Sequence, residues 1–250
     1  MSARKPPQQR RFQFSNLGVT RGALVIAGLE LGLSLIWLLA NKEAKGDIAL
    51  LLVASPSQIF EDFKLWTLVT SPLLEMQFLG LLLHVLMLFT FIPTLERFWG
   101  TGRFYRFVAI TSIVGTIAGV AVGQLLGRNV PINGLSPMIW ASVVAFGIIY
   151  ARQPVQFWGV LPLTGRQLMY GFIGFGALFV GLQQLWELAA AFAAAMLTAA
   201  LMVSKRWSPG LAWKRWRIAR ARAKLSVMQG GQTGKPAGKS GKRDEQQWLN

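Results

Sequence analysis

The chain has no cysteine and a single histidine, His84, among its 250 residues. The absence of cysteine excludes disulfide bridges, thiolate metal sites and a cysteine nucleophile. Because imidazole is the usual side chain that moves a proton near neutral pH, the chain has one position for that chemistry. Charged residues are also scarce, at 14% of the chain, whereas a soluble domain carries roughly a quarter. This composition points to a membrane protein.

Apolar residues make up 53% of the chain and gather in six long runs. A helix that spans a bilayer needs about 20 residues, with a range of about 17–25. The first three runs reach this length, and the last three borrow flanking residues. We therefore expect an all-α integral membrane protein with a bundle of six transmembrane helices, or five if the fourth run is re-entrant. The six runs are 22–40, 78–95, 105–126, 137–151, 168–182 and 188–203.

The positive charge of the chain is concentrated near its ends. Of 26 Lys and Arg residues, twelve follow Val203 and five lie in the N-terminal tail, and the net charge is +16. With six spans, both tails lie on one side of the membrane, and the other side holds only Lys42, Lys45, Lys64 and Arg128. Because basic residues accumulate on the cytosolic side, we expect both termini in the cytosol. The basic charge then attracts anionic lipid, and nucleic acid is disfavoured as a partner.

The sequence predicts four parts. Residues 1–21 form a basic cytosolic tail, and 22–204 form the membrane domain. Residues 205–228 carry three tryptophans among eight basic residues, a composition typical of a helix that lies on an anionic leaflet. Residues 229–250 are rich in polar residues and glycine and are predicted to be disordered. The long connection between the first two apolar runs is expected in the lipid–water interface, with Trp66 among its anchors.

Three motifs resemble those of the rhomboid superfamily of intramembrane serine proteases. They are Leu-Trp-Thr-Leu-Val-Thr at 65–70, Leu-Glu-Arg-Phe-Trp-Gly-Thr-Gly-Arg-Phe at 95–104, and Gly-Leu-Ser-Pro at 134–137. The resemblance covers about residues 20–204 and implies a six-helix scaffold that contacts membrane lipids and transmembrane segments of other proteins. A bacterial inner membrane is favoured over an organelle membrane. The residues that the resemblance assigns to the scaffold are Trp66, Glu96, Gly100, Arg103 and Gly134.

The sequence departs from the rhomboid pattern at the catalytic positions. The family's base is a histidine in the sixth span, but residues 187–192 read Glu-Leu-Ala-Ala-Ala-Phe. The family's second-span histidine corresponds to Gly80, and His84 stands where the family has an asparagine. Pro137 replaces the glycine that follows the serine. The resemblance therefore favours a pseudoprotease that binds transmembrane clients. The alternative is a serine endopeptidase with Ser136 as nucleophile and a non-standard base.

The polar residues of the apolar runs have two interpretations each. Ser136 is either a nucleophile, which needs an adjacent base, or the N-cap of the fourth helix, with Pro137 as its first residue. His84 either joins two helices or faces a cavity near Ser136 as an oxyanion donor or substitute base. Glu30, midway along the first run, is costly unless it faces protein or water, and it is not expected to join a catalytic set. The sequence favours the structural roles and predicts no cofactor or metal.

Overall fold

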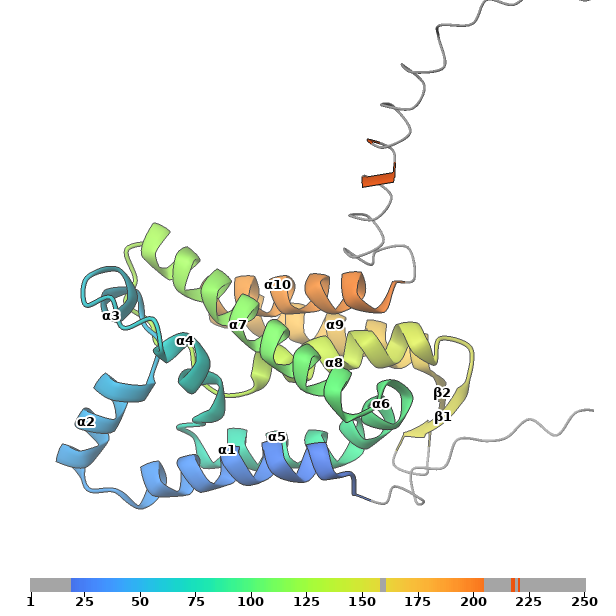
Figure 1. The fold of residues 1–250 in the computed structure, drawn as a ribbon, viewed down its shortest axis with the longest axis horizontal. Coiled ribbons are helices and arrows are strands. Elements are labelled where there is room, and N and C mark those ends of the chain that lie inside the picture. The colour runs from blue at the N-terminus through green and yellow to red at the C-terminus, as the bar shows by residue number, and fades with distance from the viewer. Residues whose placement is uncertain (1–18, 158–160, 205–216, 219, 221–250) are drawn as a thin grey trace, which may run out of the picture. The chain divides into compact units, whose positions relative to one another are not determined.

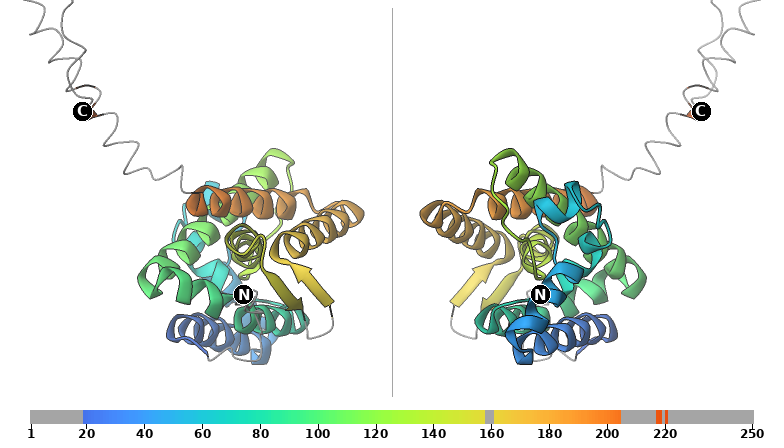
Figure 2. Two further views of the ribbon diagram at one scale, coloured as in Figure 1. Left: turned by 90° about the vertical axis from the view of Figure 1, so that its right-hand side faces the viewer. Right: turned by 90° about the vertical axis from the view of Figure 1, so that its left-hand side faces the viewer.

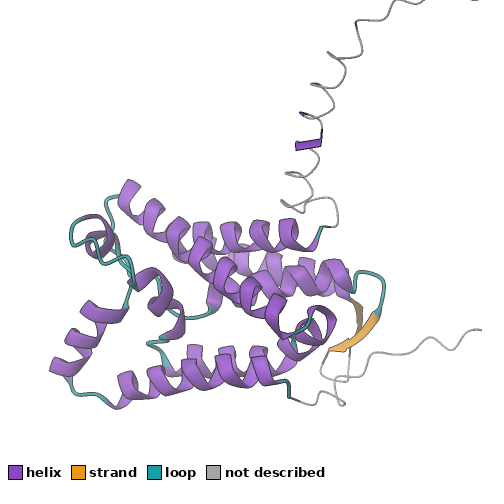
Figure 3. Cartoon of the chain, in the orientation of Figure 1, coloured by secondary structure: helices purple, strands orange, loops and turns teal. Residues whose placement is uncertain are grey.

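The computed structural model describes residues 19–157, 161–204, 217, 218 and 220. This part of the chain is mostly helical, with one two-stranded hairpin (Figure 1; Figure 3). All six apolar runs form helices. The elements in chain order are α1 (Arg21–Leu39), α2 (Lys42–Leu52), α3 (Pro56–Phe60), α4 (Thr67–Thr70), η2 (Ser71–Leu73), α5 (Phe78–Thr90), α6 (Ile92–Trp99), α7 (Thr101–Leu125), α8 (Ser136–Ile149), β1 (Pro154–Phe157), β2 (Leu161–Thr164), α9 (Gly165–Gln183) and α10 (Trp186–Val203).

The predicted tails lie almost entirely outside the described residues. Of the basic N-terminal tail, the structure describes only residues 19–21. Of the predicted interfacial helix at 205–228, it describes only 217, 218 and 220, which are helical. None of 229–250 is described.

Three of the described helices are long and apolar enough to cross a membrane, namely α1, α7 and α10. The pair formed by α4–η2 and α5 meets the same criterion but bends by 86° at its break, so it forms a fourth span or a re-entrant loop. Helix α8 has only 14 residues, or about 21 Å at 1.5 Å per residue, and so falls short of a hydrocarbon core of about 30 Å. Several spans are thus present, and the count of six remains a prediction.

The second apolar run is divided between two helices, whereas the sequence predicted one helix over 78–95. Helix α5 ends at Thr90, and Pro93 lies in the first turn of α6. Proline has no N–H to donate and clashes with the carbonyl four residues earlier, so it kinks or breaks a helix that would otherwise continue through Pro93. The same residue is well suited to the start of a new helix. The predicted boundary is therefore wrong, for a reason the sequence itself contains.

The connection between α1 and α5 is also more helical than predicted. Asn41 caps α2 by accepting a hydrogen bond from the Ala44 N–H, and Ser55 caps α3 in the same way. Trp66 is half exposed and donates its Nε1–H to the carbonyl of Leu51 at 2.9 Å. Its location at the membrane interface stays a prediction.

Helix α8 lies at the centre of the helices α5, α7, α9 and α10, as the end-on views in Figure 2 show. Its residues from Pro137 to Gly147 are nearly all buried, as expected for a helix that is apolar on every side. Strands β1 and β2 pair antiparallel, with Pro154 opposite Thr164, and return the chain from α8 to α9.

Three glycines let α7 pack closely on α10 and on the start of α8. A Cβ added to Gly115 would lie 2.6 Å from the Cβ of Pro137, and one added to Gly119 would lie 3.1 Å from the carbonyl oxygen of Glu187. Gly123 is the third of these glycines, and a Cβ added to it would lie 3.1 Å from the carbonyl oxygen of Arg128. A spacing of four residues puts all three on one helix face, and small residues permit such close approach between membrane helices. The close approach at Gly115 brings the start of α8 against α7.

Candidate functional site

Glu30, His84 and Ser136 form one hydrogen-bonded row across three helices. The Nε2 atom of His84, on α5, lies 2.7 Å from the Oγ of Ser136 at the start of α8. The Nδ1 atom of the same ring lies 2.6 Å from the Oε1 of Glu30, midway along α1. The sequence singled out all three residues but did not expect Glu30 to join the other two. The row corrects that expectation, because it supplies Ser136 with an adjacent imidazole.

Burial decreases along the row from the carboxylate to the hydroxyl. Glu30 is fully buried and His84 is 6% exposed, whereas Ser136 is half-buried. A carboxylate at membrane depth is costly unless it is paired and hydrogen-bonded, and the bond to His84 offsets part of that cost. Within the described residues, the second oxygen of Glu30, Oε2, has no hydrogen-bond partner. Ser136 is thus the least buried residue of the row.

The carboxylate of Glu30 decides which ring nitrogen of His84 carries a proton. An ionised carboxylate only accepts hydrogen bonds, so it favours the tautomer in which Nδ1–H donates to Glu30. The lone pair of Nε2 is then free to accept the O–H of Ser136. Such an arrangement orients the imidazole and prepares it to remove the hydroxyl proton.

A second carboxylate, Glu75, lies beside the row and was missed by the sequence reasoning. Its Oε2 is 3.8 Å from the Nδ1 of His84, too far for a hydrogen bond. Its other oxygen accepts a hydrogen bond from the N–H of Gln77 at 3.0 Å, and its own N–H donates to the hydroxyl of Ser34 at 2.8 Å. The sequence does carry a signal for it, since Glu75, like Glu30, is an acidic residue set among apolar ones.

Hydrogen bonds tie the segment that leads into α8 to two other parts of the chain. The N–H of Ile132 donates to the carbonyl of Ala54 at 2.9 Å, and the N–H of Gly134 donates to the carbonyl of Ser71 at 3.0 Å. The hydroxyl of Ser71 donates to the carbonyl of Ile132. Gly134 has φ +76°, a conformation that residues with a side chain rarely adopt. These contacts place Ser136 two residues beyond a fixed turn.

Ser136 does not serve as the predicted N-cap. The structure assigns that position to Leu135, makes Ser136 the first residue of α8, and gives the helix no side-chain cap. The hydroxyl is directed to His84 instead. Pro137 follows in the first turn, where proline is favoured. The proline was read correctly as a start signal, but the helix begins one residue earlier than predicted.

The scaffold residues of the middle motif lie outside the row. Glu96, at the end of α6, accepts hydrogen bonds from the N–H groups of Gly22 at 2.9 Å and Ala23 at 3.0 Å. These are the first N–H groups of α1, where an anion is favoured. Gly100, with φ +80°, turns the chain from α6 into α7, and Arg103 is exposed on α7.

The hydrogen bonds to Glu96 change its acidity. Burial of the carboxylate raises the pKa of Glu96, but the hydrogen bonds that it accepts more than offset this effect. They include those from the hydroxyl of Thr101 and from the two N–H groups of α1. The net result is a pKa of Glu96 below the ordinary value.

Among the residues that the structure describes, no group of three or more His, Asp or Glu side chains is arranged to hold a metal ion. Glu75 lies beside the row of Glu30, His84 and Ser136 without a hydrogen bond to His84.

The family to which the chain belongs follows from a match to one family model. A model described as "Eukaryotic integral membrane protein (DUF1751)" matches residues 23–205, nearly the same range as the membrane domain predicted from the sequence. No curated protein matches the chain. The description as eukaryotic speaks against the bacterial inner membrane favoured from the sequence.

The match also corrects the rhomboid resemblance, because the matched family is a different one. The motifs that carried the resemblance have local structural causes: Glu96 binds the start of α1, and Gly100 and Gly134 occupy turns with positive φ. Such requirements are set by packing and backbone geometry and do not identify a family. The chain belongs to the DUF1751 family of eukaryotic integral membrane proteins.

Proposed function

We propose that this membrane protein is a serine hydrolase in which Ser136 is the nucleophile, His84 the general base and Glu30 the group that orients the imidazole. The observation that carries the proposal is the pair of hydrogen bonds to the two nitrogens of His84, at 2.7 and 2.6 Å. A nucleophile, a base and an orienting carboxylate in hydrogen-bond reach of one another make up the arrangement that activates a serine in unrelated folds.

The proposed reaction begins with attack of the Ser136 Oγ on the carbonyl carbon of an ester or amide. His84 takes the hydroxyl proton on Nε2 and then delivers it to the leaving oxygen or nitrogen as the bond between that atom and the carbonyl carbon breaks. Water releases the acyl group from Ser136 in the second half of the cycle, and His84 acts as base again. Glu30 accepts the Nδ1–H of the ring and keeps the imidazole oriented toward Ser136.

The N-terminus of α8 supplies donors for the oxyanion that this attack creates. The first N–H groups of a helix have no intrahelical partner. Pro137 has no N–H, and the N–H of Ile139 is bound to the carbonyl of Leu135 at 2.9 Å. The N–H groups of Ser136 and Met138 remain as the candidate donors. The absence of a donor at Pro137 predicts a slower enzyme than one with a full set, since one such donor contributes roughly 10²–10³ in rate.

The proposal includes the topology expected from the sequence, with six spans and both termini in the cytosol. Helix α8 then begins toward the non-cytosolic side, so water reaches Ser136 without crossing the whole hydrocarbon core. Ser136 is half-buried, and in this topology it lies near the non-cytosolic end of α8, which suits an ester or amide substrate that reaches the site from that side of the membrane.

The test is covalent labelling of the purified protein with a fluorophosphonate probe. Wild type and Ser142→Ala are expected to be labelled, because the hydroxyl of Ser142 is bound within α8 to the carbonyl of Ile139 at 2.7 Å and takes no part in the row. Ser136→Ala is expected to lose the label, and His84→Gln to lose most of it. Labelling of wild type no stronger than that of Ser136→Ala would contradict the proposal.

A second function, binding of transmembrane segments without chemistry, is favoured by one feature of α1. Gly28 and Gly32 are both exposed, and a Cβ added to either would meet nothing within 4 Å. Two glycines four residues apart on an apolar helix form a surface on which another helix can pack closely. Glu30 lies between them in sequence but points into the bundle, where it is fully buried.

This second function makes a different prediction. Gly28→Leu fills the open surface without a clash inside the protein, so it should abolish crosslinking to transmembrane partners and leave thermal stability unchanged. Gly46→Leu, on α2, is the matched control, because an added Cβ there also meets nothing within 4 Å. Equal crosslinking of both variants and wild type would exclude the Gly28–Gly32 surface as the binding site.

A further inference from the structure

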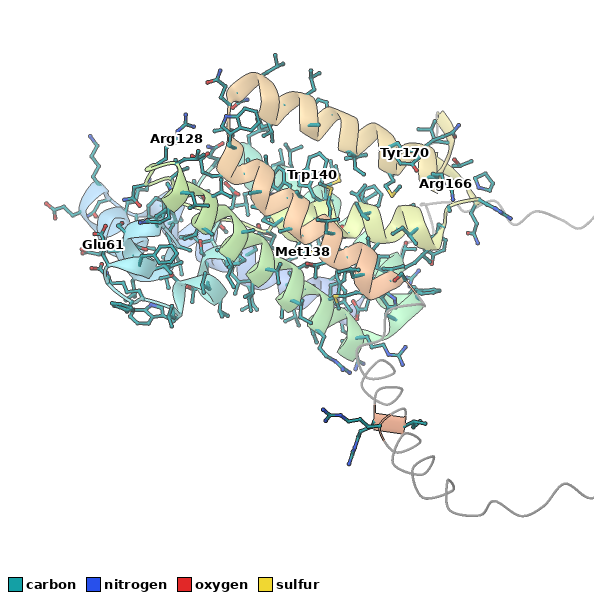
Figure 4. The ribbon with its side chains drawn as sticks, turned by 90° about the horizontal axis from the view of Figure 1, so that it is seen from above. Glu61, Arg128, Met138, Trp140, Arg166 and Tyr170 are labelled. Carbon is teal, nitrogen blue, oxygen red and sulfur yellow. The ribbon has the colours of Figure 1, made fainter. Side chains whose placement is uncertain are left out.

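A pocket of about 280 Å³ opens between α8, α9 and α10. Trp140 of α8 contributes its inner wall, and the view in Figure 4 shows this residue between the two later helices. Helix α9 contributes Ile173 and Gly181, and α10 contributes Trp186 and Ala193. The lining is apolar throughout. The pocket lies apart from the row of Glu30, His84 and Ser136, none of which lines it.

The inner wall of the pocket is rigid. The indole of Trp140 packs on the ring of Phe192 with centroids 5.3 Å apart, and a Cβ added to Gly176 would lie 2.6 Å from the same indole. The other walls carry small side chains, including Ala177, Gly181 and Ala193. The pocket thus exists because the residues that face Trp140 across it are small.

The apolar lining of the pocket favours an apolar occupant, because a polar group buried there would find almost no hydrogen-bond partner among the lining side chains. A single hydrocarbon chain matches these walls. In a membrane helix bundle, the molecule that presents such chains is lipid.

One cation lies at the rim of the pocket. The Nη1 of Arg128 donates to the carbonyl of Gln184 at 3.2 Å and lies 3.6 Å from the Oε1 of Glu187. Gln184 stands in the turn between Gly181 and Trp186, and both of those residues line the pocket. Figure 4 shows Arg128 at this end of α9 and α10.

The guanidinium can bind a further anion. The Arg128 side chain is 47% exposed, and both of its contacts to described residues use Nη1. Arginine has five N–H donors, and its planar fork matches a phosphate. The ion pair with Glu187 is longer than a hydrogen bond and leaves the outer donors available. Charge and shape therefore suit one molecule, with an apolar chain in the pocket and an anionic phosphate at its rim.

We propose that the pocket binds one acyl chain of a membrane phospholipid, with the lipid phosphate held by Arg128. This site does not depend on hydrolysis at Ser136, and it gives the protein a defined lipid ligand at the end of α9. Lipid that merely surrounds the protein would contact all exposed apolar faces alike, including those of α1 and α5.

The test uses phosphatidylcholine that carries a photoactivatable group in one acyl chain, added to the full-length protein in lipid nanodiscs. Crosslinks are mapped by mass spectrometry of peptides. They are expected to concentrate on Trp140 and on the pocket walls of α9 and α10. Gly181→Leu should lower capture there at least about fivefold, and Gly174→Leu should not. An added Cβ at either glycine meets nothing within 4 Å, but only Gly181 lines the pocket.

Arg128→Gln should also lower capture, and Arg128→Lys should retain most of it, because the phosphate needs a positive charge at this position. Capture spread evenly over α1, α5 and α9, or capture unaffected by Gly181→Leu, would contradict the proposal that the pocket binds an acyl chain. If Gly181→Leu abolished capture but Arg128→Gln left it unchanged, the proposal that Arg128 holds the lipid phosphate would be contradicted. Ser136→Ala should capture lipid as wild type does, so the outcome is separate from that of the hydrolase test.

Discussion

The Oγ of Ser136 lies 2.7 Å from the Nε2 of His84, although 52 residues separate them in the chain. Because the sequence holds one histidine, no other imidazole can act on this serine. The contact is formed where α5 meets α8 within the bundle, and the second nitrogen of the ring is held by Glu30 of α1. Three helices must therefore pack correctly before the serine has its base.

Two carboxylates lie near His84, and the distances assign the orienting role to Glu30. Its Oε1 is 2.6 Å from Nδ1, whereas the Oε2 of Glu75 is 3.8 Å away. We predict that Glu30→Gln lowers the rate of fluorophosphonate labelling by on the order of 10³–10⁴, as loss of the orienting carboxylate does in serine proteases. The measurement is the second-order rate constant of labelling.

Glu75→Gln is the matched control for this rate. The amide oxygen of glutamine can still accept the hydrogen bond from Gln77, so the loop keeps its contact while the charge is removed. A change of less than about tenfold is expected, since the lost charge makes no hydrogen bond to the imidazole. If Glu75→Gln slowed labelling as much as Glu30→Gln, the assignment of roles would be wrong.

Gly134 is predicted to be the glycine of the site that least tolerates a side chain. Alanine at a left-handed position costs about 1–2 kcal/mol for the backbone alone. A Cβ at Gly134 would also collide with the carboxylate of Glu75 and lie 3.0 Å from the Cε1 of His84, which adds roughly 1–3 kcal/mol of overpacking. Gly134→Ala should therefore lower the thermal midpoint and slow labelling.

Gly127→Ala is the control that separates the backbone cost of alanine from the cost of overpacking. Gly127 has φ +65°, and an added Cβ there meets nothing within 4 Å. It should show the backbone cost alone and label at the wild-type rate. Equal thermal midpoints for the two alanine variants would show that the space beside Glu75 is not restrictive.

The pattern of apolar runs predicted every long helix of the fold, and it failed at particular residues. Pro93 divides the second run, which a count of apolar residues does not register. The 14-residue α8 and the bent pair α4–η2 and α5 leave the number of spans open. A hydropathy pattern shows how long and how apolar a segment is. Whether a short or broken helix crosses the membrane also depends on its contacts with neighbouring helices.

The candidate site was identified residue by residue but not as an assembly. Glu30, His84 and Ser136 each stood out as polar groups within or at the start of apolar runs, where such groups are costly. Their grouping depends on the rotations and crossings of α1, α5 and α8, which the periodicity of one sequence does not fix. The rhomboid resemblance implied a base in the sixth span, so its absence there favoured the structural interpretation of His84 over the role of base for Ser136.

The carboxylate of Glu96 gives the fold a pH-dependent contact. The pKa of Glu96 is lowered in the folded protein, so the ionised form stabilises the fold. This stabilisation is complete above the unfolded pKa of 4.5 and is lost as pH falls through the lower folded pKa. Removing the charge by Glu96→Gln should cost about 1.5–3 kcal/mol near pH 7, seen as a lower thermal midpoint in detergent.

As pH falls below 4.5 and through the lower folded pKa of Glu96, the thermal midpoints of wild type and Glu96→Gln should converge, because wild type then loses its own charge at Glu96. Glu43→Gln is a control on α2, since its side chain is exposed and its midpoint should follow that of wild type. A gap between wild type and Glu96→Gln that stayed constant down to acid pH would show that the charge of Glu96 does not stabilise the start of α1.

The proposed topology predicts which segments meet the glycosylation machinery of a eukaryotic cell. An Asn-Xaa-Thr acceptor inserted after Gly127, between α7 and α8, should be glycosylated. The same acceptor inserted after residue 159, between β1 and β2, or after residue 240, should stay unmodified. Glycosylation of the site after residue 240 would place the C-terminus on the non-cytosolic side and exclude the topology.

Nuclear magnetic resonance of the imidazole nitrogens of His84 tests the central claim most directly. Because the chain has one histidine, labelling histidine with ¹⁵N reports on this ring alone. The account predicts a protonated Nδ1 and an unprotonated Nε2 at neutral pH, with the Nε2 signal shifting in Ser136→Ala and unchanged in Ser142→Ala. An Nε2 that carries the proton, or one that is indifferent to Ser136→Ala, would contradict the claim that His84 is poised as the base for Ser136.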